Sequence, residues 1–268
     1  MKLKKKPLLQ LLMHQYGNEY TKDQLNAFIA CRNVYADGEL STDPRQMLDE
    51  TSTLSLSFER YVSRGGYKLE HALDAFSLPV EGLVMLDAGS STGGFTDCLL
   101  QRGAKIVHSV DVGYNQLDWR LRTDSRVLVH EKQNIMTLES LDPPAQAAVC
   151  DFSFRSIGEA ASHILSLAGD TWLVALIKPQ FEVPKGLEDF TGVITDPALL
   201  TEVMHTVYSF LSDEGVGFHA LTMSPLTGHK GNREFLGLLK KSEGLDAASF
   251  RGRLEALLAL PQSAGRYP

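Results

Sequence analysis

Short apolar runs that alternate with helical patterns constrain the fold of this chain more than any other feature. Six such runs follow one another between residues 83 and 223, and segments with apolar residues at helical spacing separate most of them. Parallel strands need a crossover between them, so the alternation predicts an α/β fold with a mostly parallel sheet and helices on both faces. The predicted strands are residues 83–87, 106–111, 127–130, 145–151, 172–178 and 216–223. The predicted helices of this part are residues 66–76, 95–101, 116–122, 156–167 and 196–211.

Four of the predicted strands end in a charged residue, namely Asp87, Asp111, Asp151 and Lys178. In open parallel sheets, ligands bind in the crevice at the carboxyl ends of the strands. A single charged strand end often marks only the point where solvent begins. Four of them at one edge predict a functional site there, and adjacent strand ends would bring Asp151 and Lys178 within reach of each other.

The loop after the first predicted strand indicates the kind of ligand. Its glycines, Gly89, Gly93 and Gly94, lack the G-x-G-x-x-G spacing of a dinucleotide-binding loop, and the chain contains no G-x-x-x-x-G-K-[ST] phosphate loop. S-adenosyl-L-methionine has no pyrophosphate and needs neither motif, while Asp111 is placed to accept hydrogen bonds from both hydroxyls of its ribose. An ordinary strand-to-helix turn is the alternative. The residues expected to bind this cofactor are Asp87, Gly89, Ser90, Ser91, Thr92, Gly93, Gly94, Phe95, Asp111 and Val112.

The first 58 residues predict a separate, small α+β domain. Residues 7–15 and 24–31 have helical spacing, and Thr21 and Gln24 are placed as a capping box before the second helix. The pair Asp37-Gly38 is a hairpin turn signal, and residues 53–57 alternate as a further strand would. We expect this domain at residues 1–58, the sheet domain at residues 59–242, and a helical or loosely ordered extension at residues 243–268. A helical-hairpin dimerisation appendage is the alternative for the first domain.

The charge distribution limits how the chain could bind nucleic acid. The net charge is −7, and residues 1–58 carry seven basic and seven acidic side chains. Any RNA contact must therefore be a local basic patch on an acidic protein. The candidates are the lysines of residues 2–6, Arg64 with Lys68, and Arg120 with Arg122 and Arg126.

The cysteines and the apolar runs indicate the compartment. Three cysteines lie far apart in apolar runs, which suggests neither a disulfide framework nor a metal site. The basic start lacks the uninterrupted apolar segment and the cleavage site of a signal peptide, and no run is long enough to cross a bilayer. We expect a cytoplasmic protein without a membrane partner and with no evident obligate protein partner.

Five segments of the chain resemble a known family. They are residues 61–69 (YVSRGGYKL), 93–104 (GGFTDCLLQRGA), 110–114 (VDVGY), 178–182 (KPQFE) and 231–236 (GNREFL). These segments closely resemble the hemolysin A family of ribosomal-RNA ribose 2′-O-methyltransferases, within the FtsJ-like superfamily. The resemblance runs from about residue 1 to residue 239, and its motifs are long and specific.

This resemblance implies a fold, a cofactor and a partner. It implies an N-terminal alpha-L RNA-binding domain followed by a Rossmann-like, seven-stranded methyltransferase domain that uses S-adenosyl-L-methionine. The implied partner is ribosomal RNA or a ribosomal subunit. The family also places a polar residue after the third strand, which makes Asn134 a candidate contact for the adenine edge. The implied catalytic set falls on Lys68, Asp151, Lys178 and Glu234.

The chemistry of such a reaction assigns a role to each member of this set. A ribose 2′-hydroxyl is a poor nucleophile, and a lysine can act as its base because the pKa of a lysine shifts readily when the amine is desolvated or placed beside another cation. We expect Lys178 to be this base, with Lys68 opposite it. Asp151 would orient the ammonium or the positive end of the cofactor, and Glu234 would position Lys68.

Two other functions remain open at this point. A catalytically degenerate RNA-binding or ribosome-assembly factor of the same fold would also explain the neutral N-terminal domain. A membrane-lysing hemolysin, which the family name suggests, is disfavoured by the lack of a signal peptide, a spanning segment and a long basic amphipathic helix. The enzyme is the favoured function because the loop and all four catalytic positions are present.

Overall fold

The computed structural model describes residues 4–152, 156–169, 171–184 and 190–260, and the described chain divides into two compact units after Arg60. This division lies two residues beyond the boundary expected at residue 58. Lys2 of the expected basic patch lies outside the described residues, as do residues 261–268 of the expected extension.

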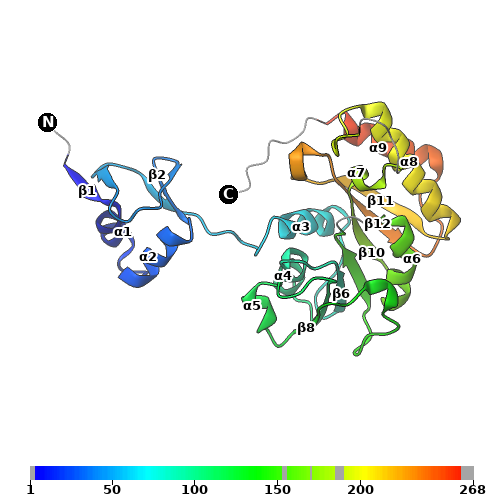
Figure 1. Ribbon diagram of the computed structural model, residues 1–268, viewed down its shortest axis with the longest axis horizontal. Coiled ribbons are helices and arrows are strands. Elements are labelled where there is room, and N and C mark those ends of the chain that lie inside the picture. Colours follow the sequence, from blue (N-terminus) through cyan, green and yellow to red (C-terminus); the bar gives the residue numbers. More distant parts are fainter. Residues whose placement is uncertain (1–3, 153–155, 170, 185–189, 261–268) are drawn as a thin grey trace. The chain divides into compact units, whose positions relative to one another are not determined.

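The first unit is small and mixes helices with short strands (Figure 1). The strands form an antiparallel pair, β1 with β4, and a three-stranded antiparallel sheet in the order β3-β2-β5. Leu8, Leu12, Leu25 and Ile29 form most of its own apolar core, together with residues of β2 and β5. Its elements are β1 (Lys5–Pro7), α1 (Leu8–Tyr16), α2 (Lys22–Ala30), β2 (Val34–Ala36), β3 (Glu39–Leu40), β4 (Met47–Asp49) and β5 (Leu54–Leu56).

Local signals of the first unit are confirmed. Thr21 and Gln24 form both hydrogen bonds of a capping box at the start of α2. The hairpin between β2 and β3 turns at Asp37 and Gly38, both with positive φ, as a tight hairpin turn requires. Strands β1 and β4 were not predicted, because each has only three residues and both pair at long range.

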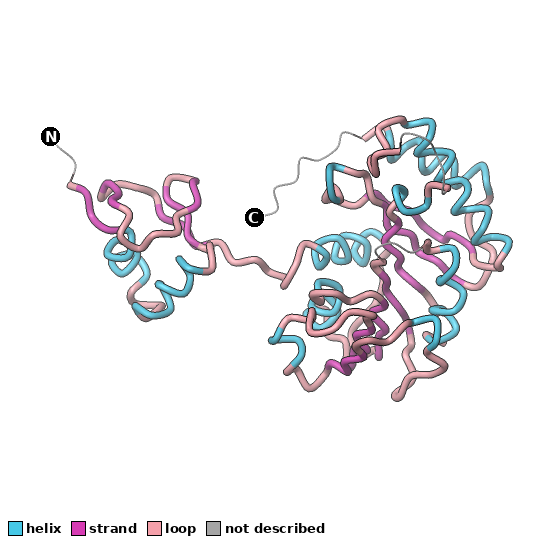
Figure 2. The backbone as a smooth tube through the Cα atoms, viewed as in Figure 1, coloured by secondary structure: helices cyan, strands magenta, loops and turns pink. Residues whose placement is uncertain are grey.

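The second unit contains a seven-stranded mixed sheet in the order β11-β12-β10-β9-β6-β7-β8. Strands β6 to β10 are parallel to one another, and β12 is antiparallel to both β10 and β11. Figure 2 shows these strands side by side with helices around them. The strands are β6 (Val84–Ala88), β7 (Ile106–Val110), β8 (Val127–His130), β9 (Ala147–Cys150), β10 (Leu173–Ile177), β11 (Gly217–Met223) and β12 (Phe235–Lys240). The helices are α3 (Gly65–Ala75), α4 (Gly94–Gln101), α5 (Trp119–Arg122), α6 (Gly158–Leu167), α7 (Pro179–Glu182), α8 (Pro197–Asp213) and α9 (Ala247–Leu258), with short 3₁₀ turns at Ile135–Thr137 and His229–Gly231.

Helices cover both faces of this sheet, as the alternation of apolar runs predicted (Figure 1). Successive residues of a strand point to opposite faces, so the fully buried strand β10 contributes Leu173 and Ala175 to one apolar core and Val174 and Leu176 to the other. Helices α6, α8 and α9 pack on the first core, and α3, α4 and α5 pack on the second. Both faces of the sheet are therefore buried beneath helices, and the edge where the strands end is left for a ligand.

Other elements of the second unit differ from the sequence prediction. Strand β12 was not predicted, although it lies inside the sheet between β10 and β11. The helix predicted at residues 116–122 is reduced to the single turn of α5. The described part of the expected C-terminal extension has the helical one of its two expected forms: α9 packs into the core through Phe250, Leu254 and Leu257.

Candidate active site

The loop between β6 and α4 comes very close to the end of β9. Gly89 has a φ of +84°, and a Cβ at this position would lie 2.7 Å from the carbonyl oxygen of Asp151. Only glycine meets both conditions, because it has no Cβ and adopts positive φ without strain. This glycine therefore lets the loop backbone and the Asp151 strand end form one continuous surface.

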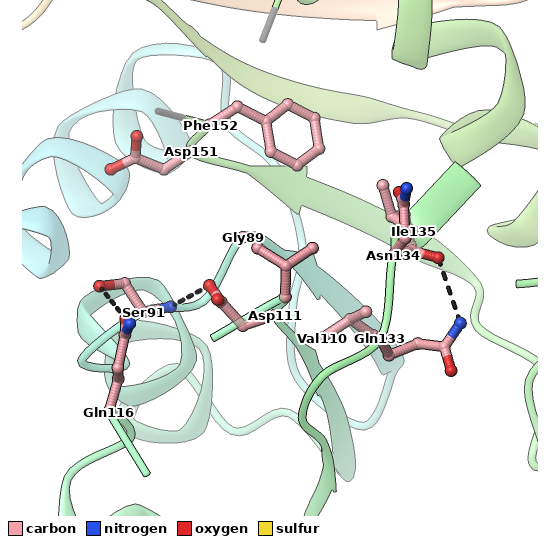
Figure 3. Close-up of a pocket in the computed structure, with 11 residues that line it drawn as sticks. Gly89, Ser91, Val110, Asp111, Gln116, Gln133, Asn134, Ile135, Asp151 and Phe152 are labelled. Carbon is pink, nitrogen blue, oxygen red and sulfur yellow. Dashed lines mark hydrogen bonds between the residues drawn. The ribbon is translucent and has the colours of Figure 1, made fainter. Parts of the chain in front are cut away.

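A pocket of about 420 Å³ opens beside this surface (Figure 3). It is lined by several of the residues predicted to bind the cofactor: Gly89, Ser91, Asp111, Val112 and Asn134. Residues from four strand ends and from the loop therefore meet at the expected edge of the sheet. Gln116, Gln133, Ile135, Asp151 and Phe152 also line the pocket.

Two hydrogen bonds orient the carboxylate of Asp111. Its Oδ2 accepts from the N–H of Ser91 at 2.9 Å, and its Oδ1 accepts from the N–H of Gly113 at 2.6 Å. A carboxylate has about four lone-pair positions, so each oxygen can still accept a hydroxyl of a ribose. In Figure 3 Asp111 lies beside Ser91 of the loop after β6. The sequence predicted that Asp111 contacts a ribose here.

Asn134 and Phe152 lie on other sides of the same pocket (Figure 3). The Oδ1 of Asn134 accepts from the N–H of Met136 at 3.1 Å, so its amide nitrogen is the donor that it can offer to a ligand. Phe152 was not predicted, and the signal that could have found it is an aromatic residue directly after the charged end of a strand. Its ring supplies an apolar wall of the kind that an adenine needs.

A second cavity, of about 250 Å³, is lined by the same loop and by the start of α3. Lys68 and Arg64 of the α3 region line it, and it shares Gly89, Ser91 and Asp151 with the first pocket. The starts of α3 and α4 pack tightly, because a Cβ at Gly94 would lie 2.2 Å from the hydroxyl oxygen of Ser63. Close packing of glycines thus places α3, and with it Lys68, beside the loop.

The four predicted catalytic residues form two ion pairs. Lys68 Nζ lies 2.5 Å from Glu234 Oε2, and both side chains are almost fully buried. Lys178 Nζ lies 2.5 Å from Asp151 Oδ1, in a more exposed position. Each buried ammonium therefore has a carboxylate to balance its charge, as burial of a cation requires.

The sheet topology explains why these pairs lie at one edge. Lys178 follows Ile177, the last residue of β10, and Asp151 follows Cys150, the last residue of the parallel neighbour β9. Strand β12 is antiparallel, so its first residue, Phe235, pairs with Ile177. Glu234 precedes this residue and therefore lies at the same edge as Lys178.

Asp87 lies in the interior and lines neither cavity. It is fully buried at the end of β6, and its Oδ2 accepts from the hydroxyl of Thr96 at 2.6 Å, which fastens α4 to the strand. Its Oδ1 has no hydrogen-bond partner among the described residues. Burial, with a smaller contribution from the charges of Asp151 and Asp111, raises the pKa of Asp87 to about 7.

The remaining loop residues differ in what they contact. Ser90, Thr92, Gly94 and Phe95 line the second cavity. Gly93 lines neither cavity; it is the N-cap residue of α4, with a φ of +95°, and a Cβ there would collide with the side chains of Leu117 and Leu121.

Comparison with known proteins identifies the family of this chain. The model of the FtsJ-like methyltransferase family matches residues 61–241, which is almost the whole described second unit. This chain belongs to the FtsJ-like methyltransferase family. The family and the fold predicted from the sequence are thereby confirmed.

Relatives match over most of their length. A protein from Mycobacterium tuberculosis named "16S/23S rRNA (cytidine-2'-O)-methyltransferase TlyA" is 38% identical, covering 82% of this chain and 84% of that protein. A protein from Brachyspira hyodysenteriae named "Hemolysin A" is 37% identical, covering 84% and 95%. The solved structure named "Putative hemolysin from Streptococcus thermophilus" has a TM-score of 0.68 at 36% identity and covers 96% of both chains. In the described part of this chain, no helix is both long and apolar enough to span a bilayer.

Proposed function

We propose that this protein transfers a methyl group from S-adenosyl-L-methionine to a ribose 2′-hydroxyl of ribosomal RNA. The observation that carries the proposal is the pairing of two lysines with two carboxylates at the sheet edge, beside a pocket of nucleoside size. The name of the relative from Mycobacterium tuberculosis supports ribosomal RNA as the substrate class.

The residues of the first pocket fit the proposed cofactor. Its volume of about 420 Å³ lies in the range of sites that bind small cofactors. Asp111 offers an oriented carboxylate to the ribose, and Asn134 offers an amide donor to the adenine edge. Gly89 lines the same pocket with its backbone. When bound, S-adenosyl-L-methionine supplies a methyl group made electrophilic by the positive charge on its sulfur.

The lysines of the two ion pairs have different tasks in this proposal. Lys178 enters this step as the neutral amine, after its own proton has passed to water, and accepts the proton of the 2′-hydroxyl at its Nζ. Asp151 orients that amine and balances the charge of the ammonium that forms. Glu234 holds Lys68 in a buried ion pair, and Lys68 stabilises negative charge on the attacking oxygen. Alignment of the two reactants contributes most of the acceleration, up to about 7–11 kcal/mol, and proton transfer adds about 10²–10⁴-fold.

The first unit is proposed to be an alpha-L RNA-binding domain that delivers ribosomal RNA or a ribosomal subunit. Its strand β1 carries Lys5 and Lys6, and Lys6 forms an ion pair with Glu50 at 2.6 Å. Lys4 and Lys5 are exposed and remain available to phosphates. An enzyme with this substrate is expected to work in the cytoplasm, where ribosomes are.

Substitution of Lys178 tests the proposal and distinguishes an active enzyme from a degenerate RNA-binding factor. Lys178→Ala and Lys178→Arg should bind the cofactor as the wild type does, but lose methyl transfer by about 10²-fold or more, because neither side chain can accept a proton at neutral pH. The measurement is single-turnover methylation of ribosomal subunits with labelled cofactor, together with calorimetry of cofactor binding. A fully active Lys178→Arg protein would remove the general base from the mechanism, and an inactive wild type would contradict the proposed function.

A further inference from the structure

Helix α9 lies outside residues 61–241, the part of the chain that the family model matches, but it belongs to the same folded unit. Phe250 and Leu254 are fully buried in the core that also contains residues of β10, β11 and β12. The ring centroid of Phe250 lies 4.7 Å from that of Tyr208 on α8 and 4.9 Å from that of Phe218 on β11. Helix α9 is thus a fixed part of the methyltransferase unit.

Two arginines connect α9 to the sheet by one hydrogen bond each. Arg253, on the helix, donates from Nε to the carbonyl oxygen of Leu221 in β11 at 2.9 Å. Arg233, just before β12, donates from Nη1 to the carbonyl oxygen of Leu258 at 3.1 Å. Leu258 is the last residue of α9, and the last carbonyls of a helix have no partner within the helix and carry its negative end. The guanidinium of Arg233 donates a hydrogen bond to one of these carbonyls and places a positive charge beside the negative end of the helix.

The neighbours of Arg233 hold two other distant segments. Asn232 is buried; its Nδ2 donates to the carbonyl oxygen of Gly192 at 2.9 Å, and its Oδ1 accepts from the N–H of Ile194 at 3.1 Å. Glu234 holds Lys68 of α3. Three consecutive side chains therefore fasten three separate parts of the unit to one short stretch of backbone.

Glu234 has little freedom to adjust if this backbone moves. Its side chain is 3% exposed, and a Cβ at Gly228 would lie 2.1 Å from Glu234 Oε1, so the carboxylate is packed closely against a neighbouring turn. A shift of the backbone at Arg233 would therefore carry the carboxylate with it. Because Lys68 lies 2.5 Å from that carboxylate, the shift would also move the Lys68 amine in the second cavity.

We propose that Arg233 is a positioning residue for methyl transfer, which fixes Glu234, and through it the Lys68 amine, by fastening their segment to the C-terminal end of α9. This inference rests on the proposed function, since it assigns Arg233 to the same reaction. It also gives α9 a role in the reaction although no residue of α9 lines either cavity at the sheet edge.

Arg253 offers a matched control for the test. Arg233→Gln and Arg253→Gln each remove one hydrogen bond between α9 and the sheet, so we expect each to lower the unfolding temperature by a similar amount, about 2–4 °C. Both should bind S-adenosyl-L-methionine as the wild type does. In single-turnover methylation of ribosomal subunits, Arg233→Gln should be slower by about 10- to 100-fold, the range that an ångström-scale misplacement causes, while Arg253→Gln keeps the wild-type rate.

Hydrogen exchange supplies a readout that does not depend on the reaction. Arg233→Gln should speed amide exchange at the start of β12 and in α3, whereas Arg253→Gln should speed it in β11 alone. Arg233→Lys keeps one charged donor, and we expect it to restore exchange protection and rate together, which keeps the proposal testable if the glutamine variant does not fold.

The outcomes separate the two proposals. Three results would each overturn the role of Arg233. The first is a wild-type methylation rate in Arg233→Gln, and the second is an equal loss of rate in Arg253→Gln. The third is an Arg233→Lys protein whose protection from amide exchange is restored while its rate stays low. A wild-type protein that methylates no ribosomal RNA would contradict the proposed function instead. In that case the exchange pattern of β12 and α3 still decides whether Arg233 holds the Lys68–Glu234 pair.

Discussion

Replacement of Asp87 with asparagine should remove a pH-dependent loss of stability from the second unit. The Asp87 carboxyl is fully buried, and one of its oxygens has no hydrogen-bond partner among the described residues. An ionised carboxylate in such a place is destabilising, because burial disfavours the charged form. Asparagine has the same shape and no charge, and its Oδ1 can still accept from the hydroxyl of Thr96.

The size of the effect follows from the two pKa values of Asp87. In the unfolded chain the pKa is the ordinary 3.8, and in the folded protein burial raises it to about 7. Below pH 3.8 Asp87 is protonated in both states, and its contribution to stability is complete. Above this pH the carboxyl ionises in the unfolded chain but stays protonated in the folded protein, so the contribution falls. It is lost once the pH has risen through about 7. At about 1.4 kcal/mol per unit, the whole loss is about 4 kcal/mol, and about 2.5 kcal/mol of it falls between pH 5 and pH 8.

Urea unfolding of both proteins at pH 5 and pH 8 measures this loss. The chain has two tryptophans, Trp119 and Trp172, and both lie in the second unit, so tryptophan fluorescence reports the unfolding of that unit. The free energy of unfolding of Asp87→Asn relative to the wild type should rise by about 2.5 kcal/mol from pH 5 to pH 8. Asp118→Asn is the control: Arg120 lowers the pKa of Asp118, so this carboxyl is ionised throughout the range and the difference should stay constant. A pH-independent difference for Asp87→Asn would refute the reasoning.

Two further predictions concern the ligands. Asp111→Asn should weaken the binding of S-adenosyl-L-methionine by about 10- to 100-fold in calorimetry, because it removes the charge from the acceptor of the ribose hydroxyls, and an unchanged affinity would contradict the ribose contact. Deletion of residues 1–58 should leave cofactor affinity intact but slow the methylation of ribosomal subunits, and the truncated protein should respond less to added salt because it has lost phosphate contacts. A truncated protein as fast as the full chain would show that the first unit does not anchor the RNA.

Local patterns in the sequence predicted most of the second unit, and long-range contacts account for the part that they missed. Strand β12 contains Gly237, and glycine inside a short apolar run is typical of a break in a strand rather than of its interior. The structure explains this glycine: a Cβ there would lie 2.7 Å from the ring of Phe218 in the neighbouring strand. No pattern within the run itself could reveal that contact.

The candidate site divides in the same way. Asp151 and Lys178 follow parallel neighbouring strands, so the rule for strand ends was sufficient to predict that they meet. Lys68 lies within a helix, and Glu234 precedes a strand that runs the other way. Neither position has a local signal, and only the resemblance to a family pointed to them. The catalytic roles of Lys178, Lys68 and Glu234 stay predictions: the Lys178 variants address the first, and the Arg233 variants address the pair of Lys68 and Glu234.

The ion pair between Lys68 and Glu234 also determines when, during synthesis, the site can be completed. The two residues are 166 positions apart, and at about 5–20 residues per second a ribosome needs roughly 8–33 s to add the chain between them. By the end of this time the loop after β6 and the five parallel strands have been made, but Lys68 still has no carboxylate from Glu234, and an unpaired cation opposes its own burial. The nascent protein therefore cannot close α3 fully onto the sheet until β12 is made. A chain that stops before Glu234 has the five parallel strands of the sheet but lacks β12, to which β11 pairs, and it lacks the carboxylate for Lys68.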